Sequence, residues 1–143
     1  MSGEAEDRPD LAAMLMRLGR HMVAVEQPIL AAHDISMWGY AVLTVLRDEP
    51  MRTQTALARS IGADKTRLIP VLDELQKRGL IEREPDPADR RVRLLGLTPA
   101  GRALHQAAQT EIREAEAVLL DQLPAGDRRT FLRALEKLGT ESA

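Results

Sequence analysis

The segment from Asp86 to Gly101 constrains the fold more than any other part of the chain. It follows the short apolar run Gly79-Leu80-Ile81, turns at two prolines and returns through Val92 to Leu97. This pattern predicts a two-stranded hairpin with a cationic tip. Thr98-Pro99 then predicts the start of a helix, with Thr98 as N-cap and Pro99 at the first helical position. We therefore expect the hairpin to lie between two helices.

The composition predicts one mainly helical domain. The chain has 143 residues, 44% of them hydrophobic, but only one Trp, one Tyr and one Phe. Such a core must be aliphatic, and the abundance of Ala, Leu, Glu and Arg favours helices over sheets. The absence of cysteine excludes disulfides, thiolate zinc sites and thiol-based redox switches. The acidic start does not resemble a signal peptide and no apolar run has membrane-spanning length, so we expect a soluble, cytoplasmic protein without a membrane partner.

The charge is unevenly distributed along the chain. Residues 1–50 carry 4 basic and 8 acidic residues, and residues 104–143 carry 5 and 7. Residues 51–103 carry 11 basic against 7 acidic residues, a net charge of +4. Affinity for phosphate depends on the local patch rather than on the total charge, so the middle third is compatible with nucleic-acid binding. A solvated surface face remains the alternative explanation for the charge alone.

Four helices are predicted before the hairpin. The first begins at Pro9 or Asp10 and carries an apolar stripe, with Pro28 either kinking it or marking its last turn. Ser36 caps a second helix that stops before Pro50. The third and fourth helices are predicted to be capped by Thr53 and Asp64 and to be ended by Gly62 and Gly79.

Two more helices follow the hairpin, one from Thr98 to about Leu119 and one from Pro124 to Leu138. The outer helices have more apolar face than a small domain needs, which indicates a dimer interface. The expected fold is therefore mainly α with a small β-hairpin wing. We interpret residues 1–143 as one domain, with dimerisation helices over 9–32 and 99–140 and a winged helix-turn-helix lobe over 36–98.

The order of these elements and the hairpin motif resemble the MarR family of transcriptional regulators. The family's wing signature has an Asp, an Arg two residues later and then Leu-Thr-x-x-Gly, and it is matched by Asp89, Arg91, Leu97, Thr98 and Gly101. The resemblance implies a dimeric, two-fold symmetric repressor or activator. It also implies a ligand cavity between the dimerisation helices and the DNA-binding lobe.

The start of the fourth helix provides the candidate base-reading residues. Helix N-terminal amides attract phosphate, and Lys65, Thr66 and Arg67 add donors in the first turn. Pro70 is expected on the outward face, where it could offer a rigid apolar surface to a thymine methyl group. A tolerated kink without DNA contact is the equally weighted alternative.

The hairpin provides the second set of DNA-binding candidates. Arg90 and Arg91 are candidates for minor-groove insertion, because a narrow groove concentrates negative potential. The resemblance implies that Asp89 forms an ion pair with a neighbour such as Arg91 and so holds the hairpin tip. The remaining candidates for backbone contacts are three arginines and three residues at a helix start, each of which could instead be a solvated surface residue: Arg52, Arg83, Arg93, Thr53, Gln54 and Thr55.

The candidate ligand-binding residues are apolar, aromatic or imidazole side chains outside the charged segment. Methionine adapts to varied apolar shapes, and Trp or Tyr supplies a polar anchor, although ordinary core positions are the alternative explanation. The three histidines, His21, His33 and His105, are isolated in sequence, so a metal site is not expected and no cofactor is implied. They are expected to border the cavity or the surface. These candidates are Met14, His21, Met22, His33, Met37, Trp38 and Tyr40.

No catalytic constellation can be assembled from the serines and histidines, and we predict no enzymatic activity and no catalytic residues. The hypothesis is a homodimeric, sequence-specific DNA-binding regulator, a repressor that is released or modulated by a small apolar or aromatic ligand. Its expected partner is a pseudo-palindromic DNA operator. The alternative is a winged-helix module that binds protein or sequesters a ligand without binding DNA.

Overall fold

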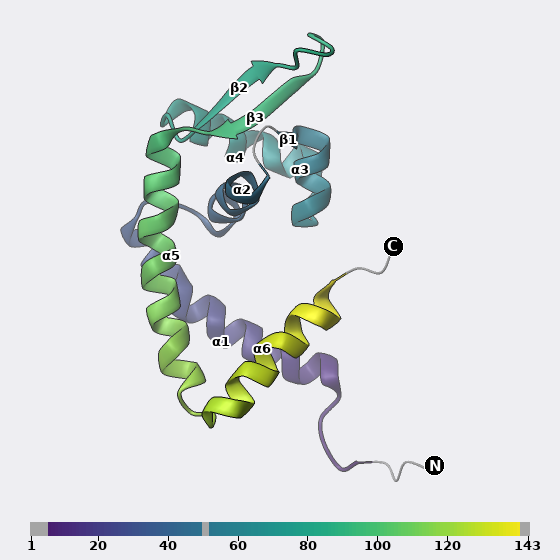
Figure 1. The fold of residues 1–143 in the computed structure, drawn as a ribbon, viewed down its shortest axis with the longest axis vertical. Coiled ribbons are helices and arrows are strands. Elements are labelled where there is room, and N and C mark those ends of the chain that lie inside the picture. Colours follow the sequence, from purple (N-terminus) through teal and green to yellow (C-terminus); the bar gives the residue numbers. More distant parts are fainter. Residues whose placement is uncertain (1–5, 50–51, 141–143) are drawn as a thin grey trace.

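A computed structural model describes residues 6–49 and 52–140. Within these ranges the chain forms helices and short strands in an order that confirms the predicted mainly helical fold with a hairpin wing (Figure 1). In chain order they are α1 (Leu11–Ala32), α2 (Met37–Asp48), β1 (Arg52–Thr53), α3 (Gln54–Ile61), α4 (Lys65–Lys77), β2 (Ile81–Pro85), β3 (Arg93–Leu97), α5 (Pro99–Leu120) and α6 (Ala125–Gly139).

The four predicted N-caps are confirmed. In each case a side-chain oxygen accepts a hydrogen bond from a backbone N–H in the first turn, which satisfies one of the donors that a helix start leaves unpaired. The bonds run to Ser36 from Gly39 (3.0 Å), to Thr53 from Ala56 (3.1 Å), to Asp64 from Thr66 (3.1 Å) and to Thr98 from Gly101 (3.0 Å).

Glycine ends α3 and follows the end of α4, as expected. Gly62 and Gly79 have φ values of 74° and 73°, a left-handed conformation that side chains with a Cβ rarely adopt. The prolines do not end their helices. α1 continues past Pro28 to Ala32, and α4 continues past Pro70 to Lys77.

The hairpin is part of a three-stranded antiparallel sheet with strand order β1-β3-β2. β2 pairs with β3 from Ile81 opposite Leu97 to Pro85 opposite Arg93, and β1 places Arg52 opposite Leu95. The sequence did not predict β1, because two residues are too few to show the alternation of a strand.

An aliphatic core lies between α2, α3, α4 and the sheet. Its fully buried residues are mostly leucines, and α5 adds Ala108 and Ile112 from the side. This core fixes the positions of α4 and the hairpin relative to each other. The leucines buried most completely are Leu43, Leu46, Leu57, Leu72 and Leu95.

Helices α1, α5 and α6 extend away from this lobe (Figure 1). No described residue of α6 is buried. A groove of about 540 Å³ runs between α1 and α6 and is lined almost entirely by apolar side chains: Leu11, Leu15, Phe131, Ala134, Leu135, Leu138 and Gly139. The single chain therefore leaves a large apolar surface uncovered.

None of the described helices is individually long and apolar enough to cross a membrane. α1 and α2 taken together have sufficient length and composition, with a bend of 83° between them.

Candidate nucleic-acid interface

The first turn of α4 presents its polar side chains to solvent. Lys65, Thr66 and Arg67 are all exposed, while the apolar stripe of α4 faces the core. The carboxylate of Asp64 accepts the Thr66 N–H, so the cap already satisfies one N-terminal donor. The two cationic side chains of this turn therefore make it the part of α4 best suited to meet a phosphate backbone.

Pro70 and Ile69 form an apolar surface next to this turn. Pro70 is exposed, as expected, but it lies along a hollow of about 290 Å³ that also contacts Ile35 and Gly39 near the start of α2. Ile69 is 42% exposed. Ile69 was not predicted from the sequence as part of this surface. It lies out of phase with the buried leucines of α4, which places it on the outer side of the helix.

Two aspartate carboxylates that accept backbone hydrogen bonds shape the wing, which comprises β2, β3 and the turn between them. The Asp86 carboxylate accepts the Ala88 N–H (2.9 Å), and the Asp89 carboxylate accepts the Arg91 N–H (3.1 Å). Asp89 also forms the expected ion pair with Arg91, at 3.2 Å between Oδ1 and Nε. Asp86 was not assigned a role from the sequence, although an Asx turn before proline is a local signal.

The arginines at and beside the wing tip point into solvent. The Arg91 side chain is 92% exposed despite its ion pair, and Arg90 and Arg93 are also exposed. The tip therefore holds a defined backbone shape while its guanidinium groups stay accessible. That combination suits insertion into a groove of negative potential.

Arg83 has a different environment from the one expected. It lies two residues after the buried Ile81 in β2, so its side chain points to the same, inward side of the strand. Its Nη2 atom donates to Asp73 Oδ1 of α4 at 3.0 Å, and only 22% of the side chain is exposed. The guanidinium that was predicted to contact phosphate thus forms an ion pair between the wing and α4 in this structure.

The candidates around the start of α3 are divided between capping and exposed positions. The Thr53 hydroxyl serves as the N-cap, Gln54 is half-buried and Thr55 is exposed. Arg52 pairs through its backbone in β1, and its side chain lies outside the described part of the structure. Thr55 is consequently the most accessible of the three described side chains.

The seven ligand candidates do not converge on one cavity. His21 and Met22 line a hollow of about 260 Å³ between α1 and α5, whereas Met14 lies exposed on α1. His33 pairs with Glu111 of α5. The other three pack half-buried against the core, which favours the alternative of ordinary core positions: Met37, Trp38 and Tyr40.

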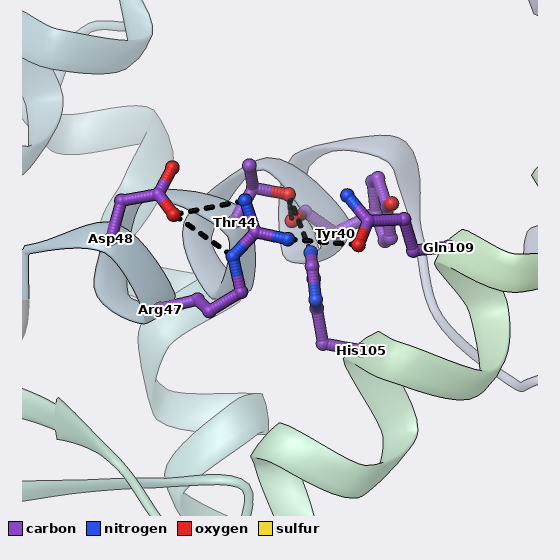
Figure 2. A network of polar contacts seen from close by, with 6 residues as sticks. All are labelled: Tyr40, Thr44, Arg47, Asp48, His105 and Gln109. Atoms are coloured by element: carbon purple, nitrogen blue, oxygen red, sulfur yellow. Dashed lines mark hydrogen bonds and ion pairs between the residues drawn. The ribbon is translucent and has the colours of Figure 1, made fainter. Parts of the chain in front are cut away.

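A polar network that was not predicted from the sequence joins α2 to α5 (Figure 2). His105 is 1% exposed, although the histidines were expected to border a cavity or the surface. The Thr44 hydroxyl donates to the Tyr40 carbonyl at 2.9 Å, so at 3.0 Å it accepts from His105 Nε2. Arg47 then donates to Gln109 at 2.8 Å and to Asp48 at 2.9 Å.

Burial shifts the pKa of several side chains in this region. It lowers the pKa of His105, and the nearby Arg47 guanidinium lowers it further. Burial also raises the pKa of Tyr40 and that of Glu26, and the neighbouring Glu116 carboxylate raises the Glu26 pKa further. In the described ranges no group of three or more His, Cys, Asp or Glu residues could hold a metal ion.

Comparison with known proteins identifies the family to which the chain belongs. The MarR family profile matches residues 35–92. The transcriptional repressor Rv2887 of Mycobacterium tuberculosis is 30% identical over 139 residues, which cover 97% of this chain and 99% of Rv2887. The solved complex of Rv2887 with DNA has a TM-score of 0.80 and 28% identity, covering 93% of this chain and 100% of that one.

A third comparison concerns the fold alone. CouR from Rhodococcus jostii RHA1, solved with p-coumaroyl-CoA bound, has a TM-score of 0.80 over 99% of both chains at 24% identity. Together with these comparisons, the three-stranded sheet, the capped α4 and the wing with its exposed arginines define a winged helix-turn-helix transcriptional regulator. The chain belongs to the MarR family, and the relatives named above are transcriptional regulators rather than enzymes.

Proposed function

We propose that the chain is a homodimeric, sequence-specific DNA-binding repressor whose affinity for its operator is changed by a small apolar or aromatic ligand. The observation that carries this proposal is the pairing of two exposed donor sets on one rigid lobe, the first turn of α4 and the wing tip. The likeness to Rv2887, a repressor solved with DNA, supports it. The protein would need access to genomic DNA, so we expect it to act in the cytoplasm.

In the proposed complex, α4 enters the major groove with Lys65, Thr66 and Arg67 foremost. Ile69 and Pro70 supply apolar surface for thymine methyl groups. The wing places its tip arginines in the flanking minor groove. Arg93 and Thr55, together with the other candidates at the start of α3, contact the backbone.

The uncovered apolar faces of α1 and α6 support a homodimer. Burying such a groove against a second copy removes its leucines from water, and each buried leucine contributes about 1.5–3 kcal/mol. A two-fold dimer would present two α4 helices about one turn of DNA apart, roughly 34 Å, which fits a pseudo-palindromic operator.

The proposed ligand acts where α1, α2 and α5 meet. Half-buried Trp38 and Tyr40 offer aromatic surface there, and the raised pKa of Glu26 reflects a partly dehydrated carboxylate close by. A ligand changes DNA affinity only if it binds one arrangement of the two lobes better than the other. His21 and Met22 line the separate hollow nearer the far end of α5 and form the second candidate surface.

The test begins with selection of bound duplexes from a random-sequence pool by the full chain. Operator affinity is then measured from 0.05 to 0.3 M salt for the wild type, Arg90→Ala and Arg91→Ala. We expect each variant to lower the salt slope by about one unit, because each removes one phosphate-neutralising charge. Arg129→Ala, an exposed arginine on α6, serves as the matched control and should leave the slope unchanged.

The competing function predicts a different result. A protein-interaction or ligand-sequestering module would give a flat selection and no salt-dependent retention on duplex DNA. That outcome would overturn the proposal. If a site is recovered, compounds that release it can be screened to identify the effector.

A further inference from the structure

Arg83 occupies a position where the strand pattern calls for an apolar residue. In β2, Ile81 is 2% exposed and faces the core, and Arg83 follows it on the same side. Glu82 and Glu84 lie exposed on the opposite side of the strand. The Arg83 side chain therefore runs beneath the wing toward α4 and not outward from the strand.

The partner of Arg83 lies on the face of α4 that we assign to DNA. Asp73 is seven residues after Thr66 and three after Pro70, spacings that place the three on one side of the helix. Arg83 Nη2 lies 3.0 Å from Asp73 Oδ1. The ion pair thus links the first strand of the wing to α4 close to the proposed DNA surface.

Stability alone does not account for an arginine at this position. Arg83 Nε is the one buried side-chain nitrogen or oxygen without a hydrogen-bond partner found in the described part of the chain. Burying an unpaired donor costs free energy, and an aliphatic side chain at this inward position would avoid that cost. The guanidinium must therefore serve another purpose, and its one ionic partner among the described residues is Asp73.

We propose that Arg83 is a positioning residue that acts through Asp73. The pair fixes the orientation of the wing relative to α4, so that both elements meet their grooves together. Arg83 itself makes no phosphate contact. This inference rests on the proposed DNA-binding function.

The direction in which one substitution changes the affinity for DNA tests the inference. Asp73→Asn removes a negative charge from the DNA-facing side, so simple electrostatics predicts equal or tighter binding. A positioning role predicts weaker binding, by about tenfold, because the wing loses its link to α4. The probe is the duplex selected by the wild-type full chain, measured at several salt concentrations. Asp73 is 60% exposed, so the variant is expected to fold, and thermal unfolding verifies it.

Glu74→Gln is the matched control. It removes the same charge from the next residue of α4, where the carboxylate forms no ion pair within the described residues. We expect operator affinity equal to or above that of the wild type. Arg83→Gln should weaken binding about tenfold with an unchanged salt slope, and Arg83→Gln with Asp73→Asn should be no weaker than either single variant.

Three results would overturn the inference. They are undiminished affinity in Asp73→Asn, additive losses in the double variant, or a salt slope lowered by one unit in Arg83→Gln, which would make Arg83 a phosphate contact. Failure of the proposed function is distinguishable from these. It would appear in the wild type itself, as an absence of salt-dependent duplex binding.

Discussion

The imidazole of His105 stacks on the ring of Tyr40, with ring centroids 4.9 Å apart and planes inclined by 11° (Figure 2). His105 belongs to α5 and Tyr40 to α2, so this stack joins the long helix α5 to the winged-helix lobe. The hydrogen bond from His105 Nε2 to Thr44 fixes the ring in place. A buried, neutral imidazole is therefore part of the joint between the two parts of the molecule.

This joint predicts that stability falls at low pH. Because the folded state holds the pKa of His105 below its ordinary value of 6.5, the unfolded chain takes up a proton first. The free energy of unfolding should therefore decrease as the pH drops below about 6.5 and level off once the folded state is also protonated. Urea denaturation at pH 5, 6, 7 and 8 measures it.

His105→Gln should lack this component, since glutamine can still donate to Thr44 but does not titrate. His21→Gln removes an exposed histidine of α1 and should retain the pH dependence of the wild type. Equal pH dependence in the wild type and His105→Gln would contradict the prediction.

Asp89→Ala should weaken operator binding even though it removes a negative charge from the wing. The Asp89 carboxylate holds both the backbone N–H and the guanidinium of Arg91, so its loss frees the tip. We expect a several-fold loss of affinity, with a change in stability within about 0.5 kcal/mol because the pair is mostly exposed. Electrophoretic mobility shifts and thermal melts give the two values.

Asp89→Asn provides the control, because its amide oxygen can still accept the Arg91 N–H. It should bind more tightly than Asp89→Ala. Unchanged affinity in Asp89→Ala would show that the tip needs no such support.

Gly101→Ala should destabilise the protein strongly. A Cβ at this position would lie 2.0 Å from the Leu80 carbonyl oxygen, a backbone atom that cannot rotate away. Overpacking of this kind costs about 1–3 kcal/mol, and this case belongs at the upper end. Gly126→Ala on α6 meets nothing within 4 Å and should be neutral or stabilising. Comparable melting temperatures of the two variants would refute this account of the α5 start.

Leu135→Glu should convert the proposed dimer to a monomer. Leu135 lines the apolar groove between α1 and α6, and a carboxylate there would be buried without a partner in a dimer. Arg133→Glu reverses a charge two residues earlier, on the other side of α6, and should leave the dimer intact. Sedimentation velocity at micromolar concentration distinguishes the species. A wild type that sediments as a monomer would remove the basis of the prediction.

Local signals made much of this fold predictable. Each predicted cap needs only a polar residue next to a helical pattern, and Ser36, Thr53, Asp64 and Thr98 all act within three residues. The expected Asp89–Arg91 pair is equally local. Such short-range interactions are specified by the sequence before any tertiary contact forms.

The features that the sequence did not predict arise from contacts between segments far apart in the chain. The Arg83–Asp73 pair depends on how β2 packs on α4, and the burial of His105 depends on how α5 crosses α2. The inward direction of Arg83 was predictable, because its two-residue spacing from Ile81 gives that direction once β2 is accepted as a strand. That the ligand candidates do not share one cavity could not be predicted in this way, because apolar residues fit either a core or a cavity.

The start of α5 is held against the turn between α4 and the wing, and this has a mechanical consequence. Thr98 donates to the Gly79 carbonyl at 2.6 Å, and Gly101 leaves no room between α5 and Leu80. α5 then runs unbroken for 22 residues, a rod roughly 33 Å long at 1.5 Å per residue. If α5 pivots by about 5° about its C-terminal end, its first turn moves by about 3 Å. Such a movement is enough to shift the wing relative to a DNA groove. In the proposed regulator, a ligand bound between α1 and α5 would in this way change the position of the wing without contacting any residue that meets DNA.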